Sequence, residues 1–214
     1  MRKRGLKFVV VLALIGAVAG ACGSEAADDA GAAGSGAASD LRAALFRVLG
    51  EHVNLAAATT GQALAGNTAG FEGAAAALEG NSNDIAGAIG SVYGMETQNA
   101  FDPLWKKHIG FFVDYTQGKA AGDQAKQDKA VADLTAYADE FGAVIESVTE
   151  ERLAKADVST LVMDHILGLK AVVDAQAAKD FGAAYAGLRP AYAHMQMICD
   201  PLATAIADQF PDKY

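Results

Sequence analysis

The chain has 214 residues, with 17 lysines and arginines against 26 aspartates and glutamates, which gives a net charge of −9. Such an acidic balance repels nucleic acid and anionic lipid and attracts cations. No basic patch with interleaved aromatic residues is present, so we expect no nucleic-acid partner. The sequence also lacks HExxH, CxxC, GxSxG and phosphate-binding glycine motifs, and we expect neither an enzyme nor catalytic residues.

The first 21 residues have the pattern of a bacterial lipoprotein signal peptide. Four basic residues precede an apolar stretch over 8–18, and small residues over 19–21 lead to Cys22. The apolar stretch is too short for a membrane span of about 20 residues. The sequence predicts that Cys22 carries lipid and anchors the protein to a membrane, outside the cytoplasm, in the periplasm or at the cell surface. A plain secreted protein is the alternative, because the small residue Ala19 stands where such signals usually have leucine.

Residues 22–39 follow as the lipidated cysteine and a predicted flexible linker, because they include no large apolar residue. Residues 40–214 have the size of one compact domain. Four of the 17 basic residues lie in the signal peptide and all 26 acidic residues follow it, so the remaining chain has 13 minus 26, or −13. Cys199 is the only other cysteine. We expect it to be a small buried side chain without a disulfide partner.

The domain is predicted to be all-α, because alanine is abundant and alternating β-branched residues are rare. Apolar periodicity indicates about six long helices. Their predicted ranges are 40–66, 68–92, 103–121, 124–148, 157–178 and 181–198, followed by a short helix from Pro201. We expect a break over 80–83, linkers over 93–101 and 149–156, and a kink at Pro190. In the sixth helix, large residues predict the inward face; they are Phe181, Tyr185, Leu188, Tyr192, Met195 and Ile198.

These helices are predicted to form a bundle of three repeated antiparallel hairpins. The first two hairpins align at an offset of 56, which pairs His52 with His108 and Asn67 with Asp123. The second and third align at an offset of 57 as far as the turn, which pairs His108 with His165. Each histidine therefore comes fifteen residues before the turn residue, which is Asn67, Asp123 or Asp180.

Fifteen helical residues span about 22 Å, so three hairpins packed in one orientation place these histidines in one layer. His194 comes fourteen residues after Asp180 and returns to the height of His165. Its counterparts in the other hairpins are Asp84 and Glu140. Met197 lies on the same helix face as His194.

Imidazole with thioether is a soft ligand set that suits copper, or a haem iron with axial His and Met. We therefore expect a transition-metal site, copper preferred, formed by His52, His108, His165, His194 and Met197. Asp84 and Glu140 are possible additional ligands. The function would be metal storage, delivery or sensing, with haem binding as one alternative.

The other alternative is a cell-surface structural or interaction module without metal, in which four ordinary core histidines bond to hydroxyls of Tyr115, Tyr137 or Tyr192. Ring separations above about 10 Å would exclude one shared metal, given His–metal bonds of about 2 Å. The protein partner of such a module is unknown.

Residues 108–116, HIGFFVDYT, and 194–197, HMQM, resemble stretches in uncharacterised bacterial secreted and lipid-anchored helical proteins. Some of those proteins are similar to partners of a small module named after the N-terminal domain of copper amine oxidases. The resemblance covers only these two stretches. It implies a possible link to copper and no amine oxidation.

Overall fold

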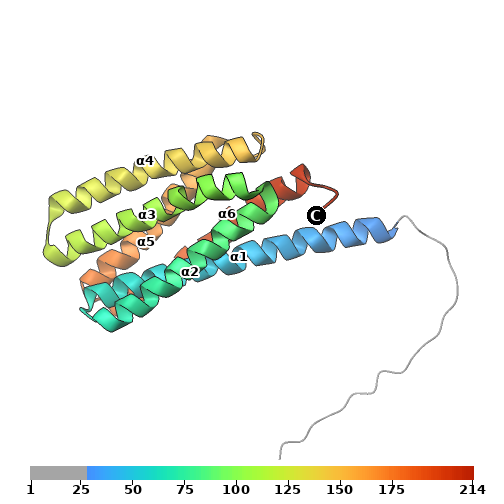
Figure 1. Cartoon of the computed structure of the whole chain (residues 1–214). Helices are drawn as coiled ribbons and strands as arrows, with labels where there is room; N and C mark the ends of the chain where they lie inside the picture. Colours follow the sequence, from blue (N-terminus) through green and yellow to red (C-terminus); the bar gives the residue numbers. More distant parts are fainter. Residues whose placement is uncertain (1–27) are drawn as a thin grey trace, which may run out of the picture.

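The computed structural model describes residues 28–214, and the predicted signal peptide and Cys22 lie outside this range. The described chain contains helices and no strand, which confirms the all-α prediction. The six helices are α1 Asp28–Leu64, α2 Thr68–Tyr93, α3 Met95–Ala121, α4 Gln124–Val148, α5 Lys155–Ala177 and α6 Phe181–Gln209 (Figure 1). None of them, within the described range, is long and apolar enough to cross a membrane.

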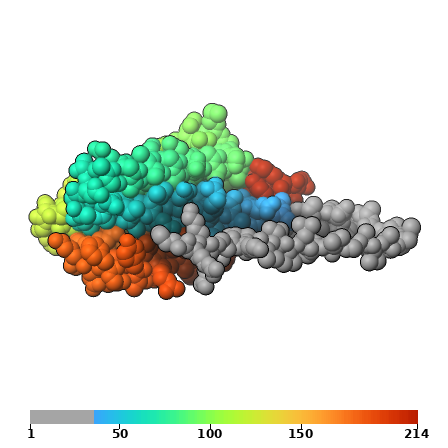
Figure 2. Space-filling view, turned by 90° about the horizontal axis from the view of Figure 1, so that it is seen from below, coloured from blue at the N-terminus to red at the C-terminus, as the bar shows by residue number. Residues whose placement is uncertain are grey.

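The helices pack as a bundle with α1, α3 and α5 at its centre. Each helix contacts the next one in the chain, and α6 returns to α1. The helices α1, α3 and α5 also contact one another, whereas α2, α4 and α6 lie around them. Figure 2 shows α1 between α2 and the segment that contains the α5–α6 turn. A side chain on the inner face of α1, α3 or α5 therefore points to a common centre.

The turns α1–α2, α3–α4 and α5–α6 lie at the same end of the bundle (Figure 1) and share one geometry. The residue before each cap is left-handed: Gly66 has φ 70°, Gly122 has φ 68° and Lys179 has φ 60°. The following Asn67, Asp123 and Asp180 each accept a hydrogen bond from the backbone N–H three residues on. These side chains satisfy amides that the first helical turn leaves free. The common geometry gives the three hairpins the same starting height.

Three helices begin earlier than predicted, and one of them is α5, which starts at Lys155 instead of Asp157. The first, α1, starts at Asp28 instead of Asp40, so the end of the predicted flexible linker is helical. Alanine-rich sequence explains this extension, because alanine has the highest helix propensity. Another, α3, starts at Met95, directly after Gly94, and replaces the predicted linker over 93–101. Pro103 is accommodated inside α3.

The predicted break in α2 over 80–83 is absent, and the helix is continuous. Asn81 and Ser82, which look like turn residues in the sequence, are buried against α1. The Asn81 side chain donates to the Val48 carbonyl at 2.9 Å, and the Ser82 hydroxyl donates to the Leu78 carbonyl. The bond from Asn81 to another helix stabilises α2 where isolated propensity predicts a break, and the Ser82 hydroxyl is satisfied within α2.

The predicted inward face of α6 is half right, since Met195 is buried and Leu188 and Ile198 pack against the core. The helix is continuous through Pro190 and Pro201. Phe181 and Tyr185 are exposed by 58% and 70%, and Tyr192 is also exposed. The buried face is formed mainly by smaller residues: Ala184, Ala191, Met195, Cys199, Leu202, Ala203, Ala205 and Ile206. Small side chains let α6 approach its neighbours closely, which a prediction based on large residues misses. Cys199 is buried, as expected.

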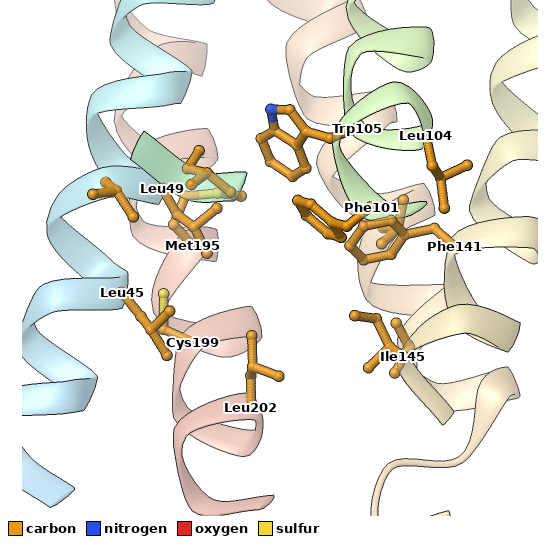
Figure 3. Packing of buried hydrophobic residues seen from close by; sticks show 14 of the residues in the cluster. Leu45, Leu49, Phe101, Leu104, Trp105, Phe141, Ile145, Met195, Cys199 and Leu202 are labelled. Carbon is orange, nitrogen blue, oxygen red and sulfur yellow. The ribbon is translucent and has the colours of Figure 1, made fainter. Parts of the chain in front are cut away.

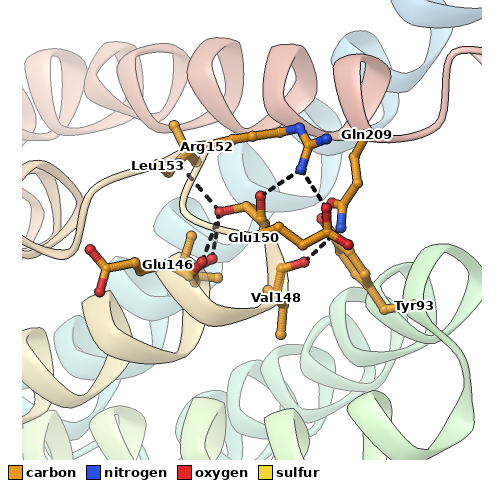
Figure 4. Close-up of polar contacts among 9 residues, drawn as sticks. Tyr93, Glu146, Val148, Glu150, Arg152, Leu153 and Gln209 are labelled. Atoms are coloured by element: carbon orange, nitrogen blue, oxygen red, sulfur yellow. Dashed lines mark hydrogen bonds and ion pairs between the residues drawn. The ribbon is translucent and has the colours of Figure 1, made fainter.

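Polar contacts close the end of the bundle opposite the three turns (Figure 4). Gln209 at the end of α6 donates to the Val148 carbonyl at 3.1 Å and accepts from the Tyr93 hydroxyl. In the loop after α4, Arg152 donates to the Thr149 carbonyl and pairs with Glu150. These contacts hold the ends of α2, α4 and α6 together beyond the apolar core.

Candidate functional site

Three of the four predicted histidines meet at the centre of the bundle. His52 comes from α1, His108 from α3 and His165 from α5, and their side chains are exposed by 2%, 3% and 8%. The His52 ring centroid lies 5.4 Å from that of His108 and 6.0 Å from that of His165. We call these residues the histidine trio. Both separations from His52 lie well inside the limit of about 10 Å beyond which one metal cannot be shared.

No hydroxyl group satisfies the trio. The Nδ1 atom of each ring is fully buried and has no hydrogen-bond partner. The tyrosines predicted as partners make other contacts: Tyr137 stacks on His108 with centroids 4.9 Å apart, and Tyr115 donates to Asp174 at 2.7 Å. Unpartnered buried polar atoms are uncommon in native proteins and call for an explanation. The trio therefore differs from ordinary, hydrogen-bonded core histidines.

The trio is uncharged at neutral pH. Burial lowers the pKa of each of the three imidazoles from 6.5 to about 3. A neighbouring imidazole adds to the effect, because His108 acts on His52, His165 on His108, and His52 and His194 on His165. At His108 the Trp105 carbonyl opposes the shift, although it is not placed to bond Nδ1. A neutral imidazole has a free nitrogen lone pair, which is the form that binds metals.

Two cavities meet at the trio. A cavity of about 200 Å³ is lined by all three rings, by Trp105 and by Met195. A second cavity of about 210 Å³ lies on the side of the hairpin turns and is lined by His52 and His108. Because Nδ1 of each ring is fully buried, Nε2 is the nitrogen that can face a cavity. Trp105 packs its edge against His52 and His108, at centroid distances of 4.9 and 4.7 Å.

His194 is near the trio but engaged elsewhere. Its Nε2 lies 2.8 Å from the Leu161 carbonyl on α5, a distance at which the ring N–H donates. The ring is half-buried. The carbonyl that His194 contacts lies one helical turn before His165, so the two histidines lie at similar heights. Unlike the trio, however, His194 has a hydrogen-bond partner.

The remaining predicted ligands are not brought to the trio. Met197 is 58% exposed, on the outer face of α6. Glu140 is exposed and pairs with Lys107. Asp84 is exposed on α2 and does not line either cavity. Met195, predicted on the inward face of the sixth helix, is buried there and also lines the cavity with the three rings. In the sequence, its position next to His194 in HMQM was the signal that could have placed it near the histidines.

The spacing of the rings approaches that of a three-histidine metal site. A metal–nitrogen bond of about 2.0–2.1 Å places a ring centroid roughly 3.1 Å from the metal. Three such rings at trigonal or tetrahedral angles have centroids about 5.1–5.4 Å apart. Within residues 28–214, no three His, Cys, Asp or Glu side chains already have an arrangement that holds a metal ion. The two separations from His52, 5.4 and 6.0 Å, exceed this range by up to about 0.9 Å, so binding requires these rings to rotate and move closer together.

Comparison with known proteins gives no relative for this chain. It matches no known protein family, no curated protein and no solved structure.

Proposed function

We propose that the protein binds a transition metal, copper(I) in preference, at His52, His108 and His165, and stores or delivers it. One observation carries this proposal: three neutral imidazoles from three different hairpins, each with an unpartnered buried Nδ1, have ring centroids 5.4 and 6.0 Å apart where measured from His52. A metal held by the Nε2 atoms would give each of these buried rings one bond, while Nδ1 would keep its proton without an acceptor.

The charge of the site supports copper(I) over divalent ions. The only carboxylate that lines the cavity, Asp157, lies in the first turn of α5, eight residues before His165 and about 12 Å along the helix. A divalent cation would be buried there without a nearby negative charge, and such burial is costly. Copper(I) has a single charge and accepts soft ligands such as the Met195 thioether.

The proposal includes a membrane-anchored location outside the cytoplasm. The basic and apolar N-terminal pattern that ends at Cys22 supports it. A haem group is less well supported, because ligand pockets of about 300–1,000 Å³ are usual for larger ligands. The cavity of about 200 Å³ would have to open for a macrocycle. A module without metal remains the competing function, and in it the three imidazoles are neutral core side chains.

Titration of metal-free protein with copper(I), against a competing chelator, tests the proposal. Trp105 is the only tryptophan of the chain, and it contacts two trio rings, so its emission should fall on binding. We expect submicromolar affinity and a loss of about 100-fold or more in His108→Ala, because one of three ligands is removed. His194→Ala is the matched control and should bind nearly as well as wild type.

Two methionine variants test the preference for copper(I). Met195→Leu should weaken copper(I) binding more than zinc(II) binding, because zinc prefers nitrogen, oxygen and thiolate ligands over thioether. Met197→Leu, two residues away and exposed, should change neither. Affinity no tighter than micromolar, or equal binding by His108→Ala and wild type, would refute the metal site.

A further inference from the structure

The cavity of about 200 Å³ extends well beyond the trio. On α1 its lining runs from His52 back to Leu45, seven residues and about 10 Å toward the end opposite the hairpin turns. Figure 3 shows the two walls of this region, with Leu45, Leu49 and Met195 facing Phe101 and Phe141 across the core. A copper ion at the trio would leave most of this length unfilled.

A cavity of this size is unusual in a close-packed interior, where voids larger than a water molecule are few. An engineered apolar cavity of about 150 Å³ in another protein stays dry and binds benzene. The present cavity is larger and is lined by Phe101, Trp105, Tyr137 and Phe141 together with aliphatic side chains. It therefore suits a ligand of about one substituted aromatic ring.

The polar groups of the lining define the chemistry of that ligand. Asp157 is the only charged side chain among the lining residues, and the trio is neutral, so nothing there balances an anion. The Trp105 Nε1 is fully buried and has no acceptor. The side chain of Trp105 is 7% exposed and lies at the wall of the cavity.

We propose that this cavity binds a small, uncharged, mainly apolar molecule of about one aromatic ring, next to the histidine trio. The volume and the apolar lining carry the proposal, and the absence of a cationic group in the lining excludes carboxylates from the ligand class. The proposal does not depend on copper, because the lining, the volume and the absence of a balancing charge are properties of the metal-free protein.

Toluene and benzoate are the probes, since both have one ring and they differ in charge. Each is titrated into the metal-free full-length protein while the emission of Trp105 is followed with excitation outside the toluene band. We expect a saturable change with toluene and at least about tenfold weaker binding of benzoate, because the cavity offers the carboxylate no countercharge. Absence of a saturable toluene response, or equal binding of benzoate, would overturn the proposal.

Val158→Phe fills the cavity and provides the decisive variant. Val158 is buried on α5, lines the cavity and lies seven residues before His165, so a phenyl ring there occupies ligand space without touching the trio ligands. We expect at least about tenfold weaker toluene binding, because the added ring removes the volume. Val131→Phe, on α4 and outside the cavity lining, is the matched control and should bind toluene as wild type does.

Circular dichroism checks that each variant folds. If Val158→Phe does not fold, Ala88→Leu, at a half-buried lining position of α2, replaces it with the same expectation. Toluene binding unchanged in a folded cavity-filling variant would place the ligand elsewhere and refute the site.

The copper and toluene experiments test the metal site and the cavity ligand independently of each other. Val158→Phe should lose toluene binding and still bind copper(I), because Val158 lines the cavity outside the trio. Copper binding without toluene binding would leave the metal site standing and remove only the cavity ligand. Toluene binding without copper binding would support the cavity ligand and refute the metal site.

Discussion

Acid should destabilise the metal-free protein through the histidine trio. The pKa of each of these imidazoles is about 3 in the folded chain and about 6.5 when unfolded, so between these values the unfolded chain binds more protons. Stability is therefore complete above pH 6.5 and is lost as the pH falls from 6.5 toward 3.

The magnitude follows from the same values. At pH 5 the unfolded histidine is almost fully protonated and the folded one is not, which costs about 2 kcal/mol for each residue. Three residues lower the free energy of unfolding by about 6 kcal/mol between pH 8 and pH 5, against a typical total of about 5–15 kcal/mol. The carboxylates contribute little in this range, since their unfolded pKa values lie near 4.

Urea unfolding at pH 8, 7, 6 and 5, in the presence of a chelator, measures this loss. His52→Leu removes one of the three groups, so its stability should fall by only about 4 kcal/mol over the same range. His194→Gln leaves the trio intact and should keep the wild-type fall. A fall below about 2 kcal/mol in wild type, or an equal fall in His52→Leu, would refute the assignment of buried neutral imidazoles.

Further predictions concern packing, the thiol and the anchor. Gly142→Ala should cost about 1–3 kcal/mol in urea unfolding, because its Cβ would lie 2.3 Å from the Ser159 hydroxyl. Gly73→Ala has open space around it and should stabilise α2 by about 0.5–1 kcal/mol. Burial raises the pKa of Cys199 to about 12, so a thiol reagent should label it only after unfolding; rapid labelling of native protein would contradict this. Cys22→Ser should release the protein from membranes in fractionation of its host, and an unchanged membrane fraction would argue against a lipid anchor.

The sequence predicted the meeting of three histidines because two regularities combine. Asn67, Asp123 and Asp180 cap the returning helices in the same way, and each histidine is fifteen residues from its cap. Helix rise then fixes the height of each ring. Which rings face inward depends on packing, and the contacts among α1, α3 and α5 favour His52, His108 and His165.

The errors have a common physical cause. Large residues were predicted on the buried side of α6, whereas close contact there is made by alanines such as Ala184 and Ala191. Met195 is buried as predicted, whereas Met197, two residues later, lies on a different face of α6 and is exposed. Asn81 was expected to break α2, but its partner, the Val48 carbonyl, comes from another helix. Single-sequence periodicity contains no information on such partners.

The origin of the histidine trio makes the site a property of the complete fold. Each ring is supplied by a different hairpin, so neither one hairpin nor any pair of them contains all three of the proposed ligands. A partly synthesised or locally opened chain would therefore bind metal poorly, and release would accompany separation of any one hairpin. A metal bound in this way would be retained only by the intact fold. Separation of one hairpin would be enough to release it to another binding site.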